Sequence, residues 1–126
     1  MSRSHSLKRK DFEIKFCEEL IKERPTFFHA LSYLGDAYTR KGFYKEGLEI
    51  DRKLVQLRPE DPTVHYNLAC SLSLLGEIDQ SLQELKKAVL LGYDDFSYIL
   101  KDADLENVRK HPQFPEFFQK IKRIKS

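Results

Sequence analysis

Histidine and cysteine are the side chains in this sequence most able to act as bases, nucleophiles or metal ligands. They are His5, His29, His65, His111, Cys17 and Cys70. Their spacing matches no zinc-ligand pattern, and two cysteines are too few for a disulfide framework. Neither His29 nor His65 has an obvious carboxylate or cysteine partner in the sequence. We therefore predict no metal site and no cofactor, with both thiols reduced and used for packing.

Motifs for enzyme chemistry are missing from the sequence. It contains no glycine-rich phosphate loop, no nucleophile elbow and no His-Glu-x-x-His pattern. Its carboxylates fall mostly on predicted outer helix faces, where they are simply solvated. We therefore predict that the protein is not an enzyme.

Hydropathy and charge limit the other function classes. No apolar run approaches the roughly 18 residues that cross a bilayer. Lys8-Arg9-Lys10 directly follow Leu7, which does not fit a secretory signal, so we expect a cytoplasmic protein with no membrane partner. The net charge is only +2, although basic residues gather at both ends of the chain. These are Arg3, His5, Lys8, Arg9, Lys10, Lys120, Lys122, Arg123 and Lys125. These basic ends leave nucleic-acid binding open as one hypothesis, although the small net charge does not argue for it.

The sequence repeats itself at an interval of 34 residues. Arg24-Pro25 recurs as Arg58-Pro59, and Gly42 recurs as Gly76. Apolar positions keep the same interval: Leu20 and Leu54, Ile21 and Val55, Leu34 and Leu68, Leu48 and Leu82, Leu57 and Leu91. Because turn residues and core positions share one register, the chain is predicted to stack repeated structural units.

Helical spacing predicts two antiparallel helices in each repeat. In the first repeat they cover about residues 27–41 and 44–57, separated by Gly42 and ended by Pro59. A lone helix over about residues 8–23 precedes them and mimics the second helix of a repeat. Its apolar side carries Phe12, Phe16, Leu20 and Ile21.

Small residues recur where the two helices of each repeat should cross. They are Gly35 and Gly47 in the first repeat, and Ala69 and Ser81 in the second. Such residues let two helix backbones approach closely.

The last third of the chain is predicted to close the array. Asp94-Asp95 can cap one short helix and Asp102 can cap a second. A final helix carries Phe114, Phe117, Phe118, Ile121 and Ile124 on one face. We expect this segment to cover the apolar face of the last repeat. The alternative is that the three phenylalanines form an exposed patch that binds a partner.

These signals predict one domain over residues 1–126. Its parts are a half-repeat helix at 8–25, repeats at 26–59 and 60–93, and capping helices at 94–124.

The repeat pattern resembles the tetratricopeptide repeat family. The first repeat carries the signature as Leu31, Leu34-Gly35, Tyr38, Gly42, Tyr44, Gly47 and Pro59. The second carries it as Tyr66-Asn67-Leu68-Ala69, Leu72, Gly76, Ile78, Ser81 and Ala88. Asp51 departs from the pattern, which usually has a large apolar residue there, and Gly92-Tyr93 replace the closing proline. The resemblance covers about residues 9–93. It implies an all-α, right-handed solenoid of helical hairpins, with the C-terminal segment as a helical cap.

In this family the first helices of successive repeats line a concave groove. The resemblance places the following residues there: His29, Tyr33, Asp36, Arg40, Tyr66, Asn67, Cys70, Ser73 and Leu74. Tyrosines supply apolar area and Asn67 can pair with an extended backbone, so we expect an adaptor or scaffold that binds a partner segment. Asp36 stands where a carboxylate-binding clamp needs an amide, which disfavours chaperone tails.

Two other interpretations of this surface stay open. The groove residues form only a solvated face in one of them. In the other, the protein associates with itself through the repeat ends or through the phenylalanine-rich last helix.

Overall fold

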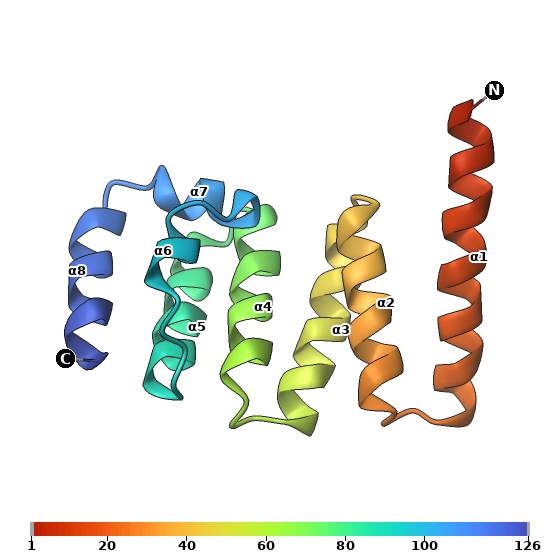
Figure 1. Cartoon of the computed structure of the whole chain (residues 1–126), viewed down its shortest axis with the longest axis horizontal. Helices are drawn as coiled ribbons and strands as arrows, with labels where there is room; N and C mark the ends of the chain where they lie inside the picture. Colours follow the sequence, from red (N-terminus) through yellow and green to blue (C-terminus); the bar gives the residue numbers. More distant parts are fainter. Residues whose placement is uncertain (1, 126) are drawn as a thin grey trace. The chain divides into compact units, whose positions relative to one another are not determined.

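The computed structural model describes the backbone of residues 2–125 and the side chains of residues 12–124. The described part of the chain is all-α, with packed helical hairpins and no strand (Figure 1). Its elements are α1 (Ser2–Glu23), α2 (Phe28–Arg40), α3 (Tyr44–Leu57), α4 (Pro62–Leu74), α5 (Ile78–Leu90), α6 (Phe96–Ile99), the 3-10 helix η1 (Ala103–Leu105), α7 (Glu106–Arg109) and α8 (Phe114–Lys125). They divide into two compact units, Met1–Leu57 and Arg58–Ser126. The all-α hairpin fold expected from the sequence is therefore confirmed.

The first unit consists of α1 packed on the hairpin of α2 and α3. Gly42 makes the turn of this hairpin with a φ of 86°, a conformation that glycine adopts at no steric cost. A Cβ atom on Gly35 would lie 3.1 Å from the Ile50 side chain, and one on Gly47 would lie 2.9 Å from Thr39 Oγ1. Both glycines thus leave room for the close approach of the two helices.

The second unit begins at a well-formed helix cap. The Asp61 carboxylate accepts a hydrogen bond of 2.8 Å from the Thr63 backbone N–H, and Pro62 opens α4. Gly76, with a φ of 79°, ends the turn into α5. Where α4 and α5 cross, the Ser81 hydroxyl donates to the Ala69 carbonyl oxygen at 2.7 Å. The predicted caps, turns and small crossing residues are all present in this hairpin.

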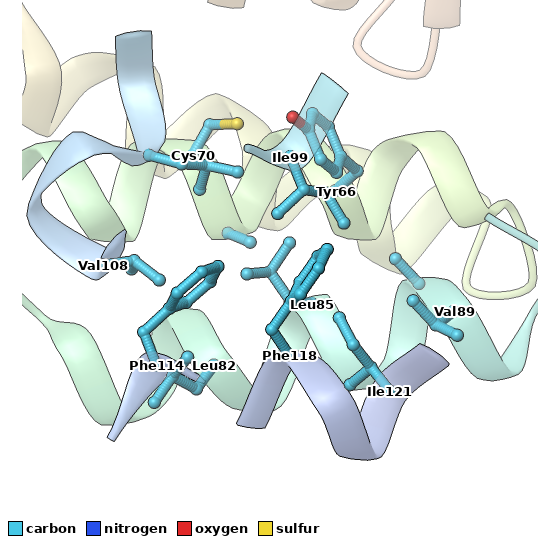
Figure 2. Packing of buried hydrophobic residues seen from close by; sticks show 13 residues of the cluster. Tyr66, Cys70, Leu82, Leu85, Val89, Ile99, Val108, Phe114, Phe118 and Ile121 are labelled. Carbon is cyan, nitrogen blue, oxygen red and sulfur yellow. The ribbon is translucent and has the colours of Figure 1, made fainter. Parts of the chain in front are cut away.

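The C-terminal helices pack on the second hairpin and cover its apolar residues. α8 lies beside α5, whereas η1 and α7 lie against α4 (Figure 1). Figure 2 shows Phe114, Phe118 and Ile121 pointing from α8 toward Leu82 and Leu85 of α5. The first two are only 6% and 8% exposed, and Ile121 is 1% exposed.

The expectation that the last helix covers the final repeat is therefore confirmed. The alternative, an exposed patch of Phe114, Phe117 and Phe118, is wrong. Two of these rings belong to the core, and Phe117 is packed against it.

The structure also bears on the expectations about membranes and about the basic ends of the chain. None of the helices described in the structure is long and apolar enough to cross a membrane. The basic side chains of residues 3–10 and of Lys125 lie outside the described ones.

We predict that Phe118→Ala lowers the free energy of unfolding of the second unit by about 3–5 kcal/mol, because it leaves a cavity under α8. Urea unfolding followed by circular dichroism measures this loss. Leu100→Ala is the matched control, since Leu100 is 50% exposed in the same unit and should cost less than about 1 kcal/mol. Equal losses in the two variants would contradict the sealing role of α8.

Candidate partner-binding site

The predicted groove residues of the first unit are exposed along α2. His29, Tyr33, Asp36 and Arg40 all reach the surface. The Arg40 guanidinium lies 5.9 Å from the centre of the Tyr33 ring, and its Nε donates to the Asp36 carbonyl oxygen at 3.3 Å. These side chains are accessible to a partner in the first unit.

In the second unit, three of the predicted groove residues are buried instead. Tyr66 and Cys70 are 5% and 7% exposed, and Ser73 is fully buried. Tyr66 stacks on Tyr93, with 4.4 Å between the ring centres. The expectation that Cys70 lies on an exposed face is therefore wrong. The chain's own C-terminal segment covers that face of α4, which leaves Asn67 exposed and Leu74 half-buried.

Asp102 is the centre of the contacts that hold this segment on α4. Its Oδ2 atom accepts a hydrogen bond of 2.6 Å from the Tyr66 hydroxyl and lies 3.7 Å from Cys70 Sγ. Oδ1 accepts the Asp104 backbone N–H at 3.0 Å. The Asp102 carbonyl oxygen accepts from Arg109 Nη1 at 2.6 Å. Side chains of α4 and α7 thus converge on one aspartate.

Cys70, Asp102 and Asp104 bring three potential metal-ligand atoms within 4.8 Å of one another. In the absence of a metal, burial and the nearby Asp102 charge raise the pKa of the Cys70 thiol well above its ordinary value, which keeps the thiol protonated. Both Asp102 oxygens also already accept hydrogen bonds from the protein. The contacts fit a hydrogen-bond network that stabilises the cap.

His65 has a structural environment that its sequence position did not reveal. The residue is 5% exposed, with Nδ1 2.7 Å from Glu84 Oε1 and Nε2 2.7 Å from the Pro59 carbonyl oxygen. The expectation that it lacks a carboxylate partner is therefore wrong, because α5 places Glu84 beside it. Both ring nitrogens are occupied by buried contacts, which suits a structural role.

An apolar groove lies between α1 and α2 within the first unit. Its volume is about 380 Å³. It is lined by Phe12, Glu13, Phe16, Cys17, Leu20, Phe27, His29, Ala30 and Tyr33. Phe12 and Phe16 are 71% and 59% exposed, although they are large and apolar. At one edge, the Tyr33 hydroxyl donates to Glu13 Oε2 at 3.3 Å. The structure therefore brings the predicted residues His29 and Tyr33 together with an apolar face of α1.

Comparison with known proteins supports the fold more than any particular use of this groove. No protein-family model matches the sequence. A chloroplastic protein of Arabidopsis thaliana is 35% identical over 83 residues, which is 64% of this chain. The chain spans only about a quarter of the length of that protein. A solved structure of MamA, a tetratricopeptide-like protein described as "MamA RS-1 ArsTM double mutant", has a TM-score of 0.67 at 17% identity. That match covers 97% of this chain and 71% of the other. The chain has a tetratricopeptide-like helical repeat fold.

Sequence reasoning did not select the α1 side of the groove. From the sequence alone, Phe12, Phe16 and Leu20 are expected only to form the packing face of a half repeat. The 34-residue register indicates this side more clearly, because Glu13 occupies the position of the small residues Gly47 and Ser81. A long charged residue at a helix crossing indicates that α1 is not packed like the second helix of an ordinary repeat.

We predict that stability of the second unit falls above about pH 9. The pKa of the Cys70 thiol is raised above 9.0 in the folded protein, so the unfolded chain loses this proton first. The associated stability is complete below pH 9 and is lost as the pH rises. Cys70→Ala should reduce this dependence by up to about 1.4 kcal/mol per pH unit.

Urea titrations between pH 7 and 10.5, followed through amide signals of α4 and α5, measure the effect. Cys17→Ala is the control, because Cys17 belongs to the first unit. An unchanged slope in Cys70→Ala would show that the thiol ionises as easily in the folded protein as in the unfolded chain.

Proposed function

We propose that the protein is a non-enzymatic interaction module that binds a segment of another protein in the groove between α1 and α2. The observation that carries this proposal is the exposure of Phe12 and Phe16 on the wall of an apolar groove. Neighbouring exposed aromatic rings are a common mark of an interaction surface.

The energy available from this groove fits reversible binding. Burying each phenylalanine contributes about 1.5–3 kcal/mol, or about 3–6 kcal/mol for the pair. Contacts with Leu20, Phe27 and Tyr33 add to this, while ordering the partner opposes it. A micromolar complex requires about 8 kcal/mol, which lies within reach of such a surface.

Other features of the described residues support binding over catalysis. Cys70 and His65 carry the chemistry most useful to an enzyme, yet both are buried in structural contacts. The tetratricopeptide-like fold supports the same choice, because repeat folds of stacked helices commonly present extended binding surfaces.

Relative to the sequence-based hypothesis, the proposal moves the site toward the first unit. His29 and Tyr33 remain in it, whereas Tyr66 and Cys70 leave it because they are buried. Asp36, Arg40, Asn67 and Leu74 remain candidates for further contacts with the partner.

We predict that Phe12→Ser combined with Phe16→Ser abolishes capture of a partner protein by the intact chain. The substitutions remove apolar contact area while leaving the fold intact, since both rings are largely exposed. Affinity capture followed by mass spectrometry compares the variant with the original protein.

The matched control replaces Leu90 and Leu100 by serine, because these side chains are 60% and 50% exposed in the second unit. It should retain the same partner. Capture that survives in the phenylalanine variant and is lost in the leucine variant would place the binding site in the second unit. Sedimentation of the purified protein tests the alternative of self-association: a dimer that dissociates in the phenylalanine variant would show that the groove binds a second copy.

A further inference from the structure

The repeat register identifies which structural position the groove occupies. Counting back 34 residues from α3, Glu13 corresponds to Gly47 and Phe16 corresponds to Ile50. In the first unit, α2 covers this face of α3, and Ile50 is only 7% exposed. Phe16 on α1 is 59% exposed instead. No described helix covers α1 as α2 covers α3, so the groove corresponds to the position of a repeat's first helix.

The two complete hairpins show how such a helix is held. A Cβ atom on Gly47 would lie 2.9 Å from Thr39 Oγ1, and Ser81 Oγ donates to the Ala69 carbonyl oxygen at 2.7 Å. At both crossings the opposing helix leaves space only for a very small side chain. A glutamate at the same position therefore changes what can pack there.

Glu13 brings a carboxylate into a largely apolar groove, whose other polar side chains are His29 and Tyr33. The described contact to it is the Tyr33 hydroxyl at 3.3 Å, which is a long hydrogen bond. An ionised carboxylate has two oxygens and can accept several hydrogen bonds. Covering it with a purely apolar helix would remove water without replacing those bonds, which is costly. A cationic side chain on the incoming helix would pair with the carboxylate and avoid this cost.

We propose that the groove binds one amphipathic α-helix of a partner protein, antiparallel to α1, with a lysine or arginine that pairs with Glu13. This inference rests on the proposed function and specifies the partner of the same site. Charge complementarity and the packing of the chain's own hairpins both define this occupant.

The chain's own first helices indicate the rest of the partner's chemistry. In α2 the face toward α3 carries Leu31, Leu34 and Gly35, followed by Thr39 opposite Gly47. The partner helix then has apolar residues at positions i and i+3, a small residue at i+4, and the cation at i+8. Such a pattern can be recognised in a candidate partner's sequence.

The experiment uses the intact chain and a fluorescein-labelled peptide that copies residues 27–41. One peptide carries Thr39→Lys and its matched control carries Thr39→Glu. Fluorescence anisotropy should show the lysine peptide binding about tenfold more tightly, the effect of one well-placed charge pair. In the chain variant Glu13→Lys the order of the two peptides should reverse. Phe16→Ser should weaken both peptides, because it removes apolar contact on which each depends.

Each alternative outcome identifies what has failed. Equal affinities of the two peptides, or no reversal in Glu13→Lys, would overturn the charge pairing. Failure of both peptides to bind would overturn the helix position. Isotope-edited nuclear magnetic resonance that finds the bound peptide extended would do the same. None of these results decides the proposed function, which the capture experiment with the Phe12 and Phe16 variant tests separately. A chain dimer that the lysine peptide disrupts would identify a second copy as the occupant and overturn the partner helix.

Discussion

Each hairpin depends on two helix backbones coming into close contact at one crossing point. In the first hairpin a side chain at Gly47 would collide with Thr39, and in the second Ser81 replaces a collision by a hydrogen bond to Ala69. This contact fixes the spacing of the paired helices and therefore the positions of every apolar residue between them. Leu34 is buried in the first hairpin, and Leu85 is buried in the second, where α8 also covers it. The contact at the crossing explains why small residues and apolar residues recur in the sequence at intervals of 34 residues.

The C-terminal segment is the reason why the two units expose different surfaces. In the second unit, the C-terminal segment packs onto α4 and α5, and the Asp102 contacts hold it there. Burying Phe114 and Phe118 stabilises the unit, while Tyr93 and Asp102 of the same segment cover Tyr66 and Cys70. In the first unit, the described chain leaves Phe12 and Phe16 uncovered on α1. The C-terminal helices thus stabilise the second unit, whereas α1 in the first unit keeps an accessible apolar surface.

Local signals made most of the fold predictable. Asp61-Pro62 mark the start of α4, and Gly42 and Gly76 mark the turns, because capping and positive φ depend on neighbouring residues alone. The burial of Cys70 could not be predicted from such local signals. It depends on Asp102, which lies 32 residues later in the chain and contacts α4 only through the tertiary fold. The partner of His65 was missed for the same reason, since Glu84 lies on the next helix, 19 residues away.

Glu13 shows how a departure from a repeat pattern can carry more information about function than the pattern itself. Positions that keep the register, such as Gly47, report packing within the chain. A carboxylate at that register position cannot pack against a helix as glycine does. Covering it removes water from a charged group, and this loss of hydration must be offset by a hydrogen bond or an ion pair. Tyr33 supplies part of that contact at 3.3 Å. The remaining acceptor capacity lies at the edge of an exposed aromatic face. One small region thus combines apolar area, which provides affinity, with a charge, which provides selectivity among helices that would otherwise bind alike.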